Sequence, residues 1–161
     1  MESYANYMLL AVATPFCLWA TWTDLKYMLI PNVLVLIMAA AFMIIAPIFL
    51  PFDVYLWRIL AGVIVLTVGF ILFSIGGLGG GDAKFAATMI MFVDQTQFIP
   101  FLLTFALFTL LAVILHKLIK FLPFAYPITK NWESWTNRKK FPLGFGMGGA
   151  LITFLAQQAF A

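Results

Sequence analysis

Charged side chains are scarce in this sequence. Asp, Glu, Lys and Arg make up 9% of its 161 residues, against about 25% in soluble domains, whereas hydrophobic residues make up 65%. An 18.0 kDa chain with a mean hydropathy of +1.07 has more apolar surface than a globule of its size can bury, and so few charges exclude a disordered chain. The composition therefore excludes an ordinary water-soluble protein and predicts a membrane protein.

Cysteine and histidine are almost absent, with one residue of each, Cys17 and His116. A single cysteine excludes an internal disulfide and a cluster of thiolate ligands for zinc. A single histidine, on the flank of an apolar run, argues against a Ser-His-Asp triad and against a histidine metal cage. We expect no metal and no cofactor, and we expect both residues to serve packing.

The formal net charge is only +3. The basic residues lie at the ends of apolar runs, where the positive-inside rule explains them better than binding to a polyanion does. Nucleic acid is therefore not an expected partner. The first apolar run follows Glu2 without a basic region or a small-residue cleavage site, so we expect it to stay as a membrane span.

Five apolar runs approach the length of about 20 residues that a helix needs to cross a bilayer. They cover residues 4–23, 30–50, 54–75, 98–119 and 141–160. A sixth candidate lies between Asp82 and Asp94, and its eleven intervening residues would cover only about 16 Å as a helix. It is either a short, tilted span or a re-entrant half-helix.

Charge placement decides between these alternatives, because Lys and Arg collect on the cytoplasmic side of short loops. If the sixth segment crosses, Arg58 lies alone on one side, and the other eight basic residues share the opposite side: Lys26, Lys84, Lys117, Lys120, Lys130, Arg138, Lys139 and Lys140. We therefore predict an all-α polytopic helical bundle of six transmembrane helices, with residues 1–161 as a single integral membrane domain. The fourth helix is short, follows a glycine-rich loop and reaches across if it extends through Gln97. Both termini lie outside the cytoplasm.

Residues 120–140 form the longest polar segment and carry Trp132 and Trp135 among basic residues. We expect a cytoplasmic loop whose aromatic side chains lie at headgroup depth against anionic membrane lipid. Docking of a substrate is the less favoured alternative.

Acidic side chains beside apolar runs are expensive in a bilayer and therefore candidates for function. Four of the six are expected to be solvated, namely Glu2, Asp53, Asp94 and Glu133. Asp24 and Asp82 differ, because the topology places both at cytoplasmic ends of spans, in one leaflet. They can meet there.

Each of these two aspartates also has a structural interpretation. Asp82 follows five glycines in six residues, Gly76-Gly77-Leu78-Gly79-Gly80-Gly81, and suits the N-cap of the short helix. Asp24 suits a loop acid paired with Lys26. The glycines alternatively give a bound extended peptide close access to the backbone, in a wet cleft. Lys84 either tunes Asp82 or extends its charge to the membrane surface.

If Asp24 and Asp82 form a functional pair, the chemistry that they can perform is acid–base catalysis. Two carboxyls within a few ångströms cannot both ionise, so the pair retains one proton. The ionised member can take a proton from water while the other polarises a peptide carbonyl. The glycines from Gly144 to Gly149 include a Gly-x-x-x-Gly pair, which predicts close packing of the last span against the bundle.

These residues resemble a known family. Gly79-Gly80-Gly81-Asp82 is similar to the Gly-x-Gly-Asp motif of the intramembrane aspartyl proteases, and Asp82-Ala83-Lys84 continues as in the type IV prepilin peptidases. Asp24, followed by Ile30-Pro31-Asn32, resembles their first aspartate region. Pro142-Leu143-Gly144 resembles the Pro-x-Gly that opens their last span. The resemblance runs from Asp24 to about Gly149.

The resemblance implies a membrane-embedded aspartic endopeptidase in the cytoplasmic (inner) membrane of a prokaryote. Asp24 and Asp82 would activate water, and the active-site loop would contain Gly79, Gly80, Gly81 and Lys84. The enzyme would remove the leader of a prepilin-like precursor (a Flp/Tad pilin, pseudopilin or preflagellin) on the cytoplasmic side, just before the hydrophobic segment.

The sequence departs from the larger, bifunctional members, whose preceding cytoplasmic domain and paired cysteines have no counterpart in it. We therefore expect leader cleavage without N-methylation, as in the short Tad-type pilus peptidases of bacteria and the archaeal preflagellin peptidases. The alternatives are a small proton- or cation-coupled transporter or channel subunit, in which the aspartates would line a polar pathway, and a catalytically silent assembly protein. The sequence assigns no oligomeric state.

Overall fold

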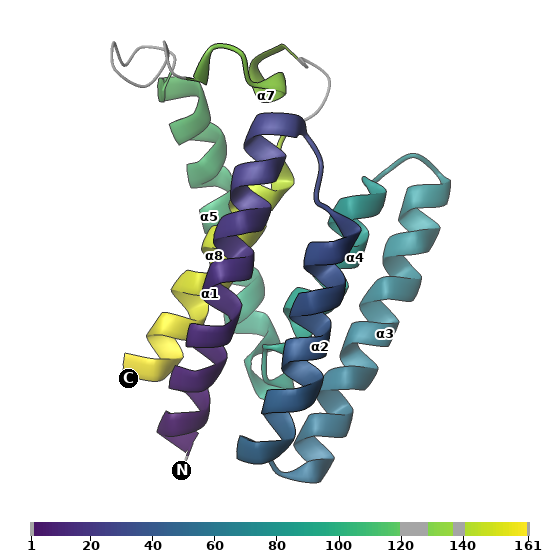
Figure 1. Ribbon diagram of the computed structural model, residues 1–161, viewed down its shortest axis with the longest axis vertical. Coiled ribbons are helices and arrows are strands. Elements are labelled where there is room, and N and C mark those ends of the chain that lie inside the picture. Colours follow the sequence, from purple (N-terminus) through teal and green to yellow (C-terminus); the bar gives the residue numbers. More distant parts are fainter. Residues whose placement is uncertain (1, 120–128, 137–140, 161) are drawn as a thin grey trace.

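The computed structural model describes residues 2–119, 129–136 and 141–160. Every regular element in these ranges is a helix (Figure 1): α1 (Glu2–Tyr27), α2 (Asn32–Phe49), α3 (Phe52–Ser74), α4 (Gly80–Met91), the 3₁₀-helix η1 (Gln95–Gln97), α5 (Phe98–Ile119), α7 (Glu133–Thr136) and α8 (Leu143–Phe160). Among the described residues, α1, α2, α3, α5 and α8 are long and apolar enough to cross a membrane. The prediction of an all-helical, multi-pass membrane protein is confirmed.

Two prolines set where helices begin. Pro31 and Pro51 occupy the N-caps of α2 and α3 with extended backbone, at φ −63°, ψ 136° and φ −55°, ψ 144°. Proline disfavours helical backbone in the residue before it, so a helix starts readily just after it, although α1 and α2 continue through Pro15 and Pro47. The hydropathy runs therefore become separate helices joined by short turns.

The helices form two groups that lie side by side (Figure 1). One contains α1, α5 and α8, in which α8 packs against both neighbours, and the other contains α2, α3 and α4, in which α4 packs mainly on α3. The five long helices and α4 alternate in direction, so the two termini lie at the same end of the bundle (Figure 1). We call this the terminal end, and we call the opposite end, where α1 finishes and α4 and α8 begin, the aspartate end.

Glycines allow both groups to pack closely. On α8, an added Cβ would lie 2.9 Å from the Cβ of Asp24 at Gly144, and 2.8 Å from the backbone oxygen of Cys17 at Gly148. Both separations are too short for a real Cβ, so α8 can approach α1 only because these positions are glycine. On α3, Gly62 and Gly69 approach α4 in the same way. The prediction that the last span packs through its glycines is confirmed.

The glycine run between α3 and α4 is divided among three roles. Gly76 has a left-handed φ of +76° and donates its N–H to Phe73, while Gly77 donates to Leu72, at 3.0 and 2.9 Å. This pair of bonds is a Schellman motif that ends α3. Gly79 is the N-cap of α4. The predicted glycine-rich loop is therefore shorter than expected, because the remaining two glycines of the run already belong to the first turn of α4.

The fourth helix is short, as predicted, but it does not extend through Gln97. It ends at Met91 after 12 residues, or about 18 Å. The carboxylate of Asp94 then accepts the N–H of Thr96 at 2.9 Å and so starts η1, which leads directly into α5. This turn replaces the last helical turns that the sequence predicted.

The expectation that Asp94 is solvated is wrong, because Asp94 forms an ion pair with Arg58. Arg58 is buried in α3, and its guanidinium donates to the backbone oxygen of Phe92 at 3.1 Å and to Asp94 at 3.2 Å. Partial burial acts to raise the pKa of Asp94, but hydrogen bonds from Thr96 and the charge of Arg58 outweigh it and hold this pKa below its usual value. The pair therefore fastens α3 to the α4–η1 turn.

Asp94→Ala is expected to lower the free energy of unfolding by about 3 kcal/mol, because it leaves the Arg58 charge buried without its partner and removes the cap of η1. Since the folded pKa of Asp94 is lowered, the wild-type contribution is present at neutral pH and is lost as the pH falls through that value. Thermal unfolding in detergent measures the change. Asp53→Ala, at an exposed acid in the first turn of α3, is the control, and an equal loss in both variants would contradict the role of the pair.

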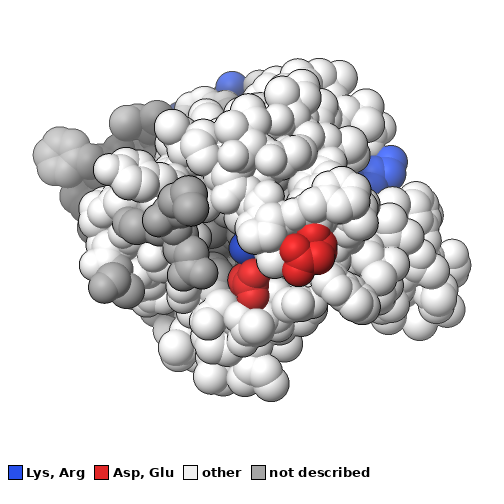
Figure 2. Space-filling view, turned by 90° about the horizontal axis from the view of Figure 1, so that it is seen from below, with Lys and Arg blue, Asp and Glu red and all other residues white. Residues whose placement is uncertain are grey.

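The described basic residues are arranged as the topology predicted. Lys26, Lys84, Lys117 and Lys130 belong to the aspartate end, and Arg58 belongs to the other half of the bundle. Lys120, Arg138, Lys139 and Lys140 lie outside the described residues. Figure 2 views the molecule from the terminal end, where few charged side chains interrupt the uncharged surface.

The two single residues, Cys17 and His116, are both packing residues, as expected. Cys17 is fully buried in the core. His116 is buried near the end of α5 and stacks on Trp135 with ring centroids 4.0 Å apart. Trp132 contacts Trp22 of α1 edge to face at 5.5 Å. The described part of the polar segment thus lies over the aspartate end of α1 and α5.

Candidate active site

Asp24 lies in the last turn of α1. The helix stops three residues later, where Met28 adopts a left-handed φ of 51° and donates its N–H to the backbone oxygen of Asp24 at 2.9 Å. This bond is the αL type of helix ending. It turns the chain towards α2 directly after Asp24, so the aspartate stays inside the bundle while the next residues cross to the neighbouring group of helices.

The carboxylate of Asp24 is held by the start of α8. Asp24 is 4% exposed, and its Oδ2 accepts the N–H of Gly144 at 2.6 Å. Gly144 lies in the first turn of α8, whose N–H groups have no partner within the helix and whose dipole favours a negative charge. The same glycine leaves no room for a Cβ beside Asp24. One residue therefore supplies both the hydrogen bond and the space for the carboxylate.

Asp82 is half-buried in the first turn of α4. The interpretation that Asp82 is the N-cap is wrong, because Gly79 occupies that position. The Asp82 carboxylate instead reaches back over Gly79, and a Cβ at residue 79 would lie 2.5 Å from its Oδ2. Glycine at this position therefore leaves open the space that the Asp82 carboxylate occupies.

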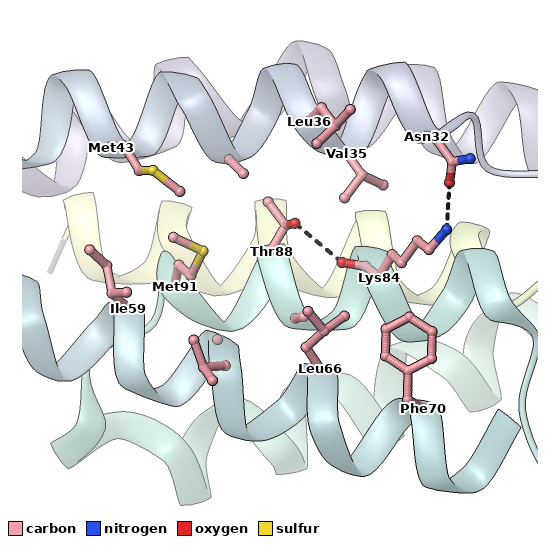
Figure 3. Close-up of a pocket in the computed structure, with 14 residues that line it drawn as sticks. Asn32, Val35, Leu36, Met43, Ile59, Leu66, Phe70, Lys84, Thr88 and Met91 are labelled. Atoms are coloured by element: carbon pink, nitrogen blue, oxygen red, sulfur yellow. Dashed lines mark hydrogen bonds between the residues drawn. The ribbon is translucent and has the colours of Figure 1, made fainter. Parts of the chain in front are cut away.

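The two aspartate regions touch through the residues that follow Asp24. A Cβ on Gly81 would lie 3.4 Å from the Cβ of Ile30 and 3.5 Å from its backbone nitrogen and oxygen. Further along each segment, two residues after Ile30 and three after Gly81, Lys84 Nζ donates to Asn32 Oδ1 at 2.9 Å (Figure 3). The Ile30-Pro31-Asn32 segment therefore packs along the start of α4, the helix that carries Asp82.

The site offers carboxyl oxygens, backbone N–H groups and one ammonium group. Among residues 2–119, 129–136 and 141–160, no three or more His, Cys, Asp or Glu side chains gather where they could hold a metal ion. A carboxyl group at the boundary between apolar helices and a polar end can serve as an acid or a base in proton transfer.

Four further residues were predicted at the site, and the structure places each of them. Gly79 is the N-cap of α4, Gly80 and Gly81 form the first turn of that helix with Asp82, and Lys84 follows two residues after Asp82. Lys84 bonds Asn32 rather than extending freely to the membrane surface. All four therefore belong to the segment that carries Asp82.

Sequence reasoning missed two participants. Gly144 was assigned to helix packing, although it also donates to Asp24, and Asn32 was noted only as part of a motif, although it binds Lys84. A partial signal was present for Gly144, because Pro142 just before a helix indicates that its first N–H groups are available. No signal was present for Asn32, which lies 52 residues from Lys84 in the chain.

Both aspartates thus lie at one end of a polytopic helical bundle, which defines a membrane protein with two acidic side chains at the same end. A protein-family model matches residues 11–116, a range that includes both aspartates, and its description is the type IV leader peptidase family. The chain belongs to this family. It is therefore a multi-pass membrane peptidase that acts on a prepilin-like substrate. No curated protein and no solved structure matches the chain.

Proposed function

We propose that this chain is an aspartic-type endopeptidase that removes the leader of a prepilin-like precursor, with Asp24 and Asp82 as its catalytic residues. The observation that carries the proposal is the contact between the two aspartate regions at Ile30 and Gly81. It joins segments more than 50 residues apart in the chain, one of which follows Asp24 and the other of which precedes Asp82.

In the proposed reaction the carboxyl pair shares one proton. The ionised carboxylate removes a proton from water, and the water oxygen attacks the carbon of the scissile peptide carbonyl while the protonated carboxyl donates a hydrogen bond to the carbonyl oxygen. Once the protonated carboxyl has passed its proton to the carbonyl oxygen, the intermediate is a diol. The diol then collapses: one of its hydroxyls returns a proton to the pair, the carbon–nitrogen bond breaks, and the nitrogen takes a proton from the pair. The new carboxyl group gives its own proton to the new amine, so the leader leaves as a carboxylate and the mature protein as an ammonium, and the pair again holds one proton.

The charge distribution supports a cytoplasmic position for the aspartate end. Four described lysines belong to it, and basic residues collect on the cytoplasmic side of a membrane protein. Both termini would then lie on the outer side of the cytoplasmic membrane. A substrate cut there would pass from water into lipid at the cleavage site, as expected of a leader that precedes a hydrophobic segment.

A transporter is less well supported. Both functional acids lie at one end of the bundle, and Asp94, the described acid at the other end of α4, is engaged by Arg58 and Thr96. A transport pathway needs ionisable groups near the midplane or on both sides. Membership of a peptidase family favours the same conclusion.

The test is cleavage by the purified protein, reconstituted in vesicles with a prepilin-like precursor. We expect one cut, located by N-terminal sequencing just before the hydrophobic segment. We expect mass spectrometry to show no methylation of the new N-terminus, even when S-adenosylmethionine is present. An intact precursor with folded enzyme would contradict the proposed function.

A further inference from the structure

A groove of about 560 Å³ lies between α2 and α3, with α4 as its floor (Figure 3). Its lining follows helical spacing on each wall. On α4 the lining residues include Lys84, Thr88 and Met91, which recur every three or four positions and so form one face over two turns. A surface of three helix faces presents ridges and grooves of the kind that receive the side chains of a further helix.

The groove exists because α2 and α3 barely contact each other, although both pack on α4. Its rim is apolar and open, with Leu36 68% exposed. Small residues, among them Ala39 on α2 and Ala87 on α4, lie within the lining. Small side chains let a neighbouring helix approach closely in lipid, where close packing is a main source of helix association.

The groove is polar at one end and apolar along the rest of its length. The Lys84–Asn32 hydrogen bond lies at one end (Figure 3), two residues beyond Asp82 in the sequence. Apolar side chains continue from there to Met43 on α2 and Met91 on α4. From residue 32 to residue 43 the groove extends about 16 Å along α2. A chain that enters the groove from the aspartate end passes a polar contact first and an apolar wall afterwards.

We propose that this groove receives, as an α-helix, the apolar segment that follows the cleavage site of the precursor. The proposal rests on the proposed function, since the order from polar to apolar matches a substrate cut at the carboxyl pair. A polypeptide in the hydrocarbon must satisfy its backbone internally, so the bound segment is helical. The groove then fixes which peptide bond lies at the aspartates.

The first test places Trp in the groove. Ala39→Trp fills the lining, whereas Ala40→Trp introduces the same side chain at the next residue, which is exposed and lies outside the groove. We expect Ala39→Trp to raise KM for the full precursor at least about tenfold with little change in kcat, as loss of binding alone requires. Ala40→Trp should retain wild-type kinetics. An unchanged KM, or a loss confined to kcat, would overturn the proposal.

The second test does not depend on cleavage. A photo-crosslinking amino acid replaces Leu36 on the rim, or Ile44 on the same helix outside the groove, in an Asp82→Asn background with labelled precursor. We expect crosslinks from position 36 to the apolar segment of the precursor and none from position 44. Crosslinks only to lipid, or only to a second copy of this chain, would overturn the proposal. Failure of the proposed function would appear separately, as a position-36 variant with both aspartates intact that crosslinks the precursor and leaves it uncut.

Discussion

Asp24→Asn and Asp82→Asn are each expected to reduce cleavage of the precursor by at least about 10³-fold, the range in which loss of an essential proton-transfer group falls. Asparagine has nearly the shape of aspartate, and its oxygen can still accept the N–H that Gly144 donates to Asp24. It cannot take a proton from water or pass one to the leaving nitrogen. The loss should therefore lie in kcat, with the fold intact.

The measurement is the initial rate of leader removal in vesicles, with thermal unfolding of each variant measured in parallel. Asp53→Asn is the matched control, because it removes a carboxylate from an exposed site at the start of α3, and its rate should stay within about twofold of wild type. If Asp24→Asn or Asp82→Asn also cleaved within about tenfold of wild type, the two acids would not be the catalytic pair.

Gly144→Ala is expected to lower kcat about 30-fold, because a small displacement of a catalytic group has a large effect on rate. Its Cβ would lie 2.9 Å from both the Cβ and the Oδ2 of Asp24. Either the carboxylate rotates away or α8 shifts, and both changes lengthen the 2.6 Å bond from the Gly144 N–H. KM should change little, since Gly144 does not line the groove.

Gly148→Ala separates this effect from general loosening of the bundle. Gly148 lies one turn further along α8 and is equally crowded by α1, but its neighbours are Thr21 and Cys17 instead of Asp24. We expect both variants to unfold at lower temperature and only Gly144→Ala to lose most of its kcat. Equal losses of kcat in the two would mean that Gly144 acts through helix packing alone.

The sequence predicted most of the fold because lipid imposes simple rules on it. A helix needs about 20 apolar residues to cross, and the predicted run 98–119 coincides with α5. Prolines and glycines then set where helices begin and end, as Pro31, Pro51 and Gly76 illustrate. The exact end of α4 escaped prediction, because it depends on Asp94 capping η1 and pairing with Arg58, and the ion pair joins residues 36 apart in the chain.

The sequence predicted which two acids form the candidate site, but it did not predict the contacts that hold them. Asp24 and Asp82 stood out because a carboxylate beside an apolar run is costly, and the charge bias placed both at one end. The bonds from Gly144 to Asp24 and from Lys84 to Asn32 span 120 and 52 residues. Such contacts depend on how the helices pack, and no local pattern in the sequence encodes that packing.

One measurement tests most directly whether the two aspartate regions meet. In a Cys17→Ser background, Ile30→Cys and Gly81→Cys are combined with a protease site inserted between α2 and α3. The Cβ atoms would lie 3.4 Å apart, close to the usual separation of about 3.8 Å in a disulfide. We predict that mild oxidation keeps the two fragments joined after proteolysis and that a reductant releases them, whereas Ile37→Cys with Gly81→Cys gives separate fragments. Fragments that separate without reductant in both pairs would contradict the account.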